Sequence, residues 1–300
     1  MIEPNSNSAN SSESSIELQI GARKRDLMGI GIWRVLPYAR RRMVGPWIFF
    51  DHIGPIDFGP GEGMEILPHP HINLATVTYL FEGQIMHRDS LGVVQTIEPG
   101  AINLMVAGKG LAHSERSVPA LREKGFRLHA LQLWLALPEE AEEIDPAFYH
   151  YGREELPELQ TGKTRLRVMI GEAFGLVSPV KTFSPALYAE ASLSPQTNLR
   201  LPENLQELAV YVVSGAININ NELVTEHTMA VCKPGSQVEN NSEMPAQLAI
   251  IGGDPVGPRY IWWNFVSSRQ ERIEQAKQDW QQDRFAKIPG ETEFVPLPAF

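Results

Sequence analysis

The sequence is poor in cysteine, with Cys232 as the single thiol among 300 residues. One cysteine excludes an internal disulfide framework and a zinc cluster built from thiolates, and it fits a reducing compartment, which we expect to be the cytoplasm. No stretch of about 18 apolar residues occurs, so no membrane-spanning helix is expected. The signatures of phosphate-binding loops, dinucleotide-binding folds and GxSxG hydrolases are also missing, which removes these common enzyme classes.

Positive charge is scarce, because 26 lysines and arginines face 36 aspartates and glutamates, giving a formal net charge of −10. A chain this acidic repels phosphate, so direct nucleic-acid binding is not expected. The stretch 22–42 is a basic exception, and it is either an anion-binding patch or a solvated strand face. We favour the strand face, because no aromatic platform accompanies the basic residues. They are Arg23, Lys24, Arg25, Arg34, Arg40, Arg41 and Arg42.

Glycine and proline are frequent, with 24 and 23 residues. Their frequency favours a turn-rich β protein over a helical bundle. Short strand-like segments separated by turn residues occupy residues 47–136 and 166–266, a pattern typical of β-sandwiches and barrels. Residues 76–85 match residues 208–217 in the second half, which agrees with a duplicated β domain.

The two ends of the chain differ from this β pattern. The first residues are rich in serine and asparagine and predict a disordered tail. Near the other end, Ser268 and Glu271 form a capping box before an apolar stripe with helical spacing, which predicts one amphipathic helix over 268–286. The expected parts are a tail (1–16), a first β domain (17–137), a polar connector (138–165) and a second β domain with the helix (166–300).

Two pairs of metal-binding side chains occur at a spacing of i, i+2: His69 with His71, and His113 with Glu115. Side chains two residues apart on an extended strand leave the same face, so three nitrogens and one oxygen converge if the two segments are neighbouring strands. This set suits a first-row metal that keeps open coordination positions. A lone HxH pair is often an ordinary surface feature, but the second pair favours a metal site. The flanking prolines predict a sheet edge.

Other residues are weaker candidates for the same site. Asp51 and His52 precede them and could orient a ligand imidazole. Gln132 and Trp134 share one face of a long apolar strand, so Gln132 either meets a ligand inside a barrel or is a satisfied core amide. His87 lies next to a turn signal, HRDSLG, and is expected at the surface.

Four segments carry a family resemblance: residues 45–55 (GPWIFFDHIGP), 68–83 (PHPHINLATVTYLFEG), 87–92 (HRDSLG) and 108–115 (GKGLAHSE). Together they resemble the pirin family of the cupin superfamily. That resemblance implies a bicupin, with two β-barrel domains of the double-stranded β-helix type and a C-terminal helix. It also implies one metal in the first barrel, usually iron, held at His69, His71, His113 and Glu115, and no metal in the second barrel. The resemblance continues more weakly to residue 266.

Several pirins resemble flavonol dioxygenases of the quercetin type. This implies a mononuclear divalent metal, with Fe(II) as the first choice and nickel, copper, manganese or zinc as alternatives, and a small aromatic substrate. Glu115 would be the catalytic proton acceptor, and Leu74 and Trp134 would help to line an apolar pocket. The alternative from the same resemblance is a non-enzymatic, metal-dependent redox sensor that binds a protein partner, for which the basic stretch 22–42 is the only supporting sequence feature.

Overall fold

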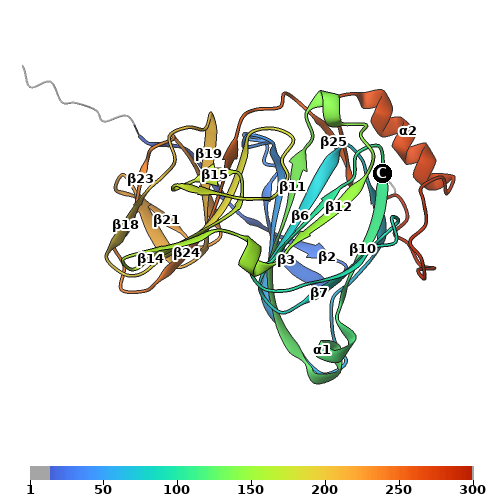
Figure 1. The fold of residues 1–300 in the computed structure, drawn as a ribbon, viewed down its shortest axis with the longest axis horizontal. Coiled ribbons are helices and arrows are strands. Elements are labelled where there is room, and N and C mark those ends of the chain that lie inside the picture. The colour runs from blue at the N-terminus through green and yellow to red at the C-terminus, as the bar shows by residue number, and fades with distance from the viewer. Residues whose placement is uncertain (1–13, 299–300) are drawn as a thin grey trace, which may run out of the picture.

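The computed structural model describes residues 14–298, so the first 13 residues of the expected tail lie outside the described part. The chain forms two β domains side by side, and helix α2 (Gln270–Gln281) packs at the outer end of the first one (Figure 1). Each domain combines a seven-stranded antiparallel sheet with a four-stranded sheet. The prediction of an all-β chain with two β-barrel domains and a C-terminal helix is confirmed.

The first domain contains the segments with the candidate metal ligands. Its larger sheet has the order β12-β9-β6-β11-β4-β3-β2, and its smaller sheet has the order β5-β10-β7-β8. Apolar side chains from both sheets pack between them. The strands are β2 (Arg23–Leu27), β3 (Ile30–Leu36), β4 (Trp47–Phe58), β5 (Glu65–His71), β6 (Leu74–Glu82), β7 (Ile85–Asp89), β8 (Val94–Ile97), β9 (Ile102–Val106), β10 (Leu111–Ser117), β11 (Phe126–Ala136) and β12 (Ala147–Tyr151), with the short helix α1 (Pro119–Lys124) before β11.

The second domain repeats this arrangement. Its sheets have the orders β1-β22-β19-β24-β17-β14-β13 and β18-β23-β20-β21, and two short pairs, β15-β16 and β25-β26, stand apart. The strands are β1 (Ile16–Gly21), β13 (Glu158–Thr161), β14 (Thr164–Ile170), β15 (Glu172–Ala173), β16 (Leu176–Val177), β17 (Ala186–Leu193), β18 (Thr197–Arg200), β19 (Glu207–Ser214), β20 (Ala216–Ile219), β21 (Glu222–Thr225), β22 (Thr228–Cys232), β23 (Gln237–Asn240), β24 (Ala246–Gly253), β25 (Tyr260–Trp262) and β26 (Phe265–Ser267).

The sheets do not follow the chain order at the expected domain boundaries. Strand β1, which we expected in the first domain, pairs with β22 of the second domain. The expected connector supplies one strand to each domain, since β12 pairs with β9 and β13 pairs with β14. Exposed strand edges favour pairing, so nearby segments complete the two sheets whatever their place in the chain. The boundaries themselves stay a prediction.

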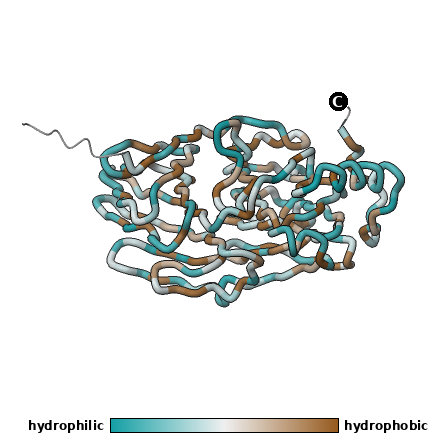
Figure 2. Tube along the Cα trace, turned by 90° about the horizontal axis from the view of Figure 1, so that it is seen from above, coloured by the Kyte–Doolittle hydropathy of each residue, from teal (hydrophilic) through white to brown (hydrophobic). Residues whose placement is uncertain are grey.

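Alternation along the strands gives each larger sheet two different faces. On β11, Leu131 and Leu133 join an apolar core that also contains Tyr211 of the second domain, so the two larger sheets pack against each other. Gln132 and Trp134 leave the opposite face and line a cavity inside the first barrel. Hydrophobic and hydrophilic residues are interspersed along the coloured trace (Figure 2). The period of two along a strand decides which residues can reach a site inside the barrel.

The C-terminal helix is shorter than the sequence predicts. Helix α2 is capped by Arg269 without a side-chain hydrogen bond, so the expected capping box at Ser268 is wrong. The Ser268 hydroxyl instead donates to Glu142 Oε2 at 2.8 Å. The helix ends at Gln281, and Asp283 has a positive φ of 57°, which a continuing helix would not allow. Among residues 14–298, no helix has the length and apolar character needed to cross a membrane.

The basic stretch 22–42 is partly engaged with the chain itself. Arg23 donates to the carbonyl oxygens of Val35 and Pro37, at 3.2 and 2.7 Å. Arg41 lies 3.2 Å from the Glu207 carboxylate of the second domain. Arg34 pairs with Asp51 inside the first domain. These contacts agree with a strand face that pairs with acidic neighbours.

Candidate metal centre

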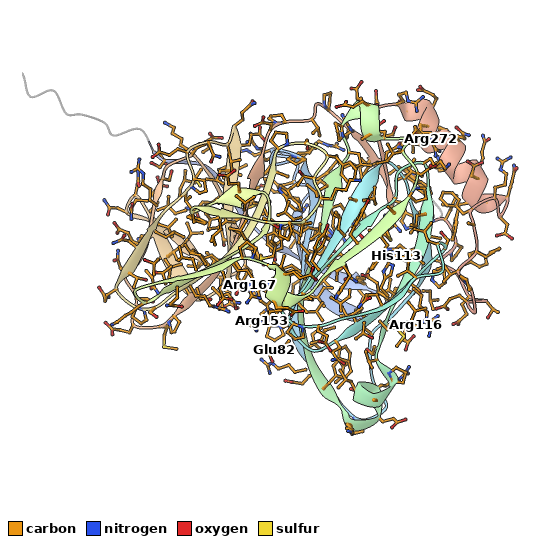
Figure 3. All side chains as sticks on the ribbon, in the orientation of Figure 1. Glu82, His113, Arg116, Arg153, Arg167 and Arg272 are labelled. Atoms are coloured by element: carbon orange, nitrogen blue, oxygen red, sulfur yellow. The ribbon has the colours of Figure 1, made fainter. Side chains whose placement is uncertain are left out.

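Strands β5 and β10 bring the two predicted pairs together. They are antiparallel neighbours, with His69 directly opposite His113. The ligand atoms of His69, His71 and His113 all lie within 4.8 Å of one another, and the three side chains are buried. Strand β5 is the edge of its sheet, as its prolines predicted. His113 lies in the domain that also carries helix α2 (Figure 3).

Glu115 belongs to a second group, which overlaps the first at His113. Its carboxylate, His113 and His87 again place their ligand atoms within 4.8 Å of one another. The four predicted ligands therefore lie in two groups that share His113. The Thr78 hydroxyl donates to Glu115 Oε1 at 3.2 Å, which orients the carboxylate inside the barrel.

His87 is the functional candidate that the sequence analysis missed. We expected it at the surface, but it is only 2% exposed, because it is an inward-facing residue of β7. The turn begins only after Asp89, and His87 stands directly opposite Glu115 of β10. His87 and Asp89 form a further pair at i, i+2 spacing, and this spacing could have indicated a shared inward face.

Backbone carbonyls fix two of the ring orientations. The Nδ1–H of His69 donates to the Leu67 carbonyl at 2.8 Å, and that of His71 donates to the Asn264 carbonyl at 3.1 Å. With Nδ1 protonated, the Nε2 of each ring keeps its lone pair for a metal. The His71 Nε2 lies 3.1 Å from the His113 Nε2, so these two nitrogens face a common point.

A series of hydrogen-bonded side chains, Asp89 and His87, orients the third ring, that of His113. His87 Nε2 lies 3.2 Å from the Asp89 carboxylate, and His87 Nδ1 lies 3.4 Å from His113 Nδ1. When His87 donates to Asp89, its Nδ1 accepts the Nδ1–H of His113, and the His113 Nε2 keeps its lone pair. In many proteins a carboxylate fixes the orientation of a metal-binding imidazole in this way. In this chain the His87 ring stands between the Asp89 carboxylate and the His113 ring.

Burial keeps these groups in a state that suits metal binding. It lowers the pKa of His69 to about 4, and lowers the pKa values of His71 and His113 well below their usual range. The rings are therefore neutral at neutral pH, as a metal ligand must be. Burial also raises the pKa of Glu115, opposed by His87 and by the Thr78 hydrogen bond. Neutral imidazoles with one carboxylate fit a divalent first-row metal.

Acid should destabilise the metal-free protein through its buried histidines. Burial lowers the pKa of His52 to about 2 and that of His69 to about 4, from 6.5. Between pH 6.5 and 4 the unfolded chain binds protons that the folded chain excludes, so stability falls as pH falls. Each such histidine costs about 1.4 kcal/mol per pH unit. We expect the melting temperature of the chelator-treated protein to drop steadily from pH 7 to pH 5; an unchanged melting temperature would contradict this.

A cavity of about 400 Å³ opens beside the histidines, which is within the size range of small-molecule sites. Trp134 lies in its wall and stacks on Phe49, with ring centroids 3.9 Å apart. Ile53, Met64, Ile66 and Ile85 add further apolar lining. The wall therefore favours a flat, largely apolar ligand.

A row of polar side chains crosses this apolar wall. The Arg34 guanidinium donates twice to the Asp51 carboxylate, at 2.8 and 2.7 Å. Burial raises the pKa of Asp51 to about 6 despite this ion pair. Thr78 Oγ1 lies 2.9 Å from Gln132 Oε1. The row is in register across four neighbouring strands, with Arg34 opposite Asp51, Asp51 opposite Gln132, and Gln132 opposite Thr78.

The weaker sequence candidates separate into two groups. Gln132, Trp134 and Asp51 line the cavity, but the Asp51 carboxylate binds Arg34 rather than a candidate ligand imidazole. Leu74 is fully buried in an apolar cluster with Trp134 and is not part of the cavity lining. The prediction for His52 is wrong, since it leaves the opposite face of β4 from Asp51.

His52 belongs to the contact between the two domains. Its Nδ1 lies 2.9 Å from the Tyr211 hydroxyl of the second domain, and its Nε2 lies 2.7 Å from His129 Nε2. Its ring also lies 5.2 Å from that of His227, between centroids. Among residues 14–298, both groups of candidate metal ligands lie in the first domain. The metal-free second barrel stays a prediction.

The C-terminal segment also contributes to the centre. Trp263, Asn264 and Val295 line the cavity, although they follow the second domain in the chain. The Val295 amide donates to the Pro68 carbonyl at 2.8 Å, next to His69. The sequence contained no local signal for these contacts, because each joins segments about 200 residues apart.

Comparison with known proteins agrees with this geometry. Residues 29–135 match the family model for pirin, and residues 188–286 match the model for the pirin C-terminal cupin domain. A pirin-like protein of Caulobacter vibrioides is 46% identical over 288 residues, covering 94% of this chain and 99% of that protein.

Solved structures support the same relationship. The crystal structure of a quercetin 2,3-dioxygenase from Acinetobacter baumannii aligns with a TM-score of 0.87 at 33% identity, covering 94% of this chain and 95% of that one. The bacterial pirin YhhW from Escherichia coli, solved in complex with nickel(II), shares the fold with a TM-score of 0.60 at 18% identity, covering 79% and 99%. With both halves matched, this chain belongs to the pirin family of the cupin superfamily.

Proposed function

We propose that this pirin is a metal-dependent dioxygenase that cleaves flavonols of the quercetin type. This proposal rests on one observation: the rings of His69, His71 and His113 converge beside a cavity with an aromatic wall. The similarity to a quercetin 2,3-dioxygenase of Acinetobacter baumannii supports the same chemistry. The cytoplasmic location stays a prediction.

The metal would be held by His69, His71, His113 and Glu115. Fe(II) is our first choice, because chemistry with dioxygen is served by a redox-active ion, and nickel, copper, manganese or zinc suit the same donor set. A divalent ion bound there would supply Lewis acidity toward a substrate hydroxyl and a site for dioxygen chemistry.

The residues around the centre would position the substrate and exclude water. A flat flavonol fits against the stacked rings of Phe49 and Trp134, with one edge toward the histidines. Gln132 and the Arg34–Asp51 pair offer hydrogen bonds to hydroxyl groups on the rest of the molecule. Polar groups at fixed positions in an apolar wall orient a ligand in this manner.

Glu115 is the candidate proton acceptor. Its burial raises its pKa, which brings its basicity closer to neutral pH and improves proton transfer from a substrate hydroxyl. The hydrogen bond from Thr78 limits this rise and holds the carboxylate in one orientation. The carboxylate would thereby gain the proton that the hydroxyl loses.

Elemental analysis combined with an oxygen electrode tests the proposal. We expect about one divalent metal ion per chain, and oxygen consumption with 3-hydroxylated flavonols that stops on chelation and returns when the metal is restored. Flavones without the 3-hydroxyl group serve as matched controls and should not be consumed. If the metal-loaded protein consumes no oxygen with any flavonol in a broad panel, the dioxygenase proposal is wrong.

A non-enzymatic co-regulator that binds a protein partner was the alternative. Its only sequence support was the basic stretch 22–42. Since Arg23, Arg34 and Arg41 all bind groups of the chain itself, the structure adds no observation in its favour.

A further inference from the structure

The β25–β26 hairpin joins the C-terminal segment to the candidate metal centre. At its tip, the Asn264 carbonyl accepts the Nδ1–H of His71, and Trp263 and Asn264 line the cavity. Phe265 forms a parallel bridge with Ile72, directly after His71. The hairpin is therefore one wall of a site whose candidate metal ligands lie on β5, β7 and β10.

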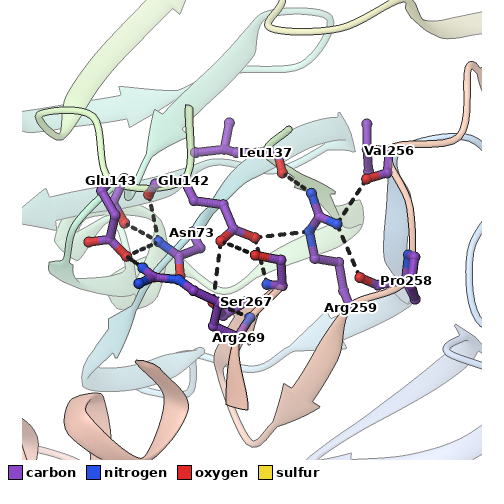
Figure 4. Close-up of polar contacts among 11 residues, drawn as sticks. Asn73, Leu137, Glu142, Glu143, Val256, Pro258, Arg259, Ser267 and Arg269 are labelled. Carbon is purple, nitrogen blue, oxygen red and sulfur yellow. Dashed lines mark hydrogen bonds and ion pairs between the residues drawn. The ribbon is translucent and has the colours of Figure 1, made fainter. Parts of the chain in front are cut away.

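One carboxylate, Glu142, holds both ends of this hairpin (Figure 4). Before β25, Arg259 Nε lies 3.0 Å from Glu142 Oε1, and both side chains are almost fully buried, at 0% and 2% exposure. At the other end, the hydroxyl of Ser267, the last residue of β26, donates to Glu142 at 3.3 Å, and the amide and hydroxyl of the following Ser268 donate at 2.7 and 2.8 Å. Glu142 thus connects the two hairpin ends within one buried cluster.

Arg259 has further partners in the segment before the hairpin and just after the end of β11. Its Nη2 donates to the Leu137 carbonyl at 2.8 Å, and its Nη1 donates to the Val256 and Pro258 carbonyls at 2.8 and 3.1 Å. A buried guanidinium cannot move away from its carboxylate without a large desolvation cost. The hairpin position is therefore coupled to the Glu142–Arg259 ion pair.

We propose that Glu142 is a positioning residue of the metal centre, acting through the hairpin and the Asn264 carbonyl on His71. This inference rests on metal binding as proposed above. When the hairpin moves, His71 loses the acceptor that keeps its proton on Nδ1, and the ring is free to rotate or to change tautomer. Loss of an outer hydrogen-bond partner of this kind typically weakens metal binding about 10- to 100-fold.

Metal affinity of the full chain tests this inference. Chelator competition with Zn²⁺ gives the dissociation constant for wild type and for Glu142→Gln, and we expect roughly 10-fold weaker binding or more in the variant. Glu158→Gln is the matched control. It also removes a carboxylate from a buried arginine, Arg167, but in the second domain, and it should leave the affinity unchanged. Glu142→Asp keeps the charge but shortens the reach, so it should also weaken binding while costing less stability.

A double-mutant cycle with His71→Ala separates positioning from general destabilisation. If Glu142 acts through His71, Glu142→Gln should weaken metal binding in the wild-type background but not in the His71→Ala background. Equal losses in both backgrounds, or unchanged affinity in folded Glu142→Gln and Glu142→Asp, would overturn the inference. Failure of the wild type to bind metal would instead contradict the proposed function.

Discussion

Replacing His113 with alanine should abolish high-affinity metal binding and turnover together. His113 is shared by the two groups of candidate ligands, and its Nε2 faces that of His71 at 3.1 Å. Its removal deletes a proposed metal ligand and disconnects His87 from the candidate centre. We expect a loss of affinity larger than the roughly 10- to 100-fold that an outer-shell change causes. Chelator competition and elemental analysis measure this loss.

His150→Ala is a suitable control for this change. His150 is a half-buried histidine of the same domain that lies 2.6 Å from the Asn103 side chain, and it belongs to neither candidate ligand group. The control should keep its metal and its oxygen uptake. If His113→Ala retained wild-type metal content at the same chelator concentration, the site would have to lie elsewhere.

Glu115→Gln should have its largest effect on turnover rather than on metal content. The amide oxygen of glutamine can still coordinate a metal, but the amide cannot accept the substrate proton. A general base contributes typically 10²-fold or more, so we expect kcat to fall by about that factor while most of the metal is retained. Single-turnover oxygen uptake, normalised to bound metal, separates the two effects.

A surface carboxylate provides the comparison for Glu115. Glu98 accepts a hydrogen bond from Gln84 on the outside of the same domain, so Glu98→Gln should leave both metal content and turnover unchanged. Full turnover in metal-loaded Glu115→Gln would show that the carboxylate is only a ligand or a spectator. The proton would then need another acceptor, and the buried carboxyl group of Asp51 would be the next candidate.

Much of the candidate site could be predicted from the sequence, because its geometry depends on short spacings. Residues at i and i+2 leave one face of a strand, and this is why His69 and His71 point the same way wherever β5 lies. Two such pairs predicted a common site on the condition that their strands are neighbours, and the pairing of β5 with β10 meets that condition. The alternating pattern of β11 likewise separated Gln132 and Trp134 from the leucines of the domain contact.

Other contacts were decided only by the tertiary structure. The sequence determined that Asp51 and His52 point to opposite faces, but only the packing of the two larger sheets decided that His52 meets Tyr211. The partner of Ser268 was predicted wrongly, because the local pattern indicated a helix cap and gave no signal of a distant carboxylate. In the folded chain, Glu142 offers a buried acceptor 126 residues away, and Ser268 binds it.

Side-chain directions along a strand could be predicted and contacts between distant segments could not, for a simple physical reason. The direction of a side chain on a strand follows from the backbone dihedral angles of a few neighbouring residues, so the sequence alone determines it. Which distant segment covers that face depends on the apolar burial and the buried polar pairs gained when whole sheets pack. The strand spacing therefore determined the candidate ligand set, whereas tertiary packing decided that the Asn264 carbonyl, 193 residues away in the chain, orients His71.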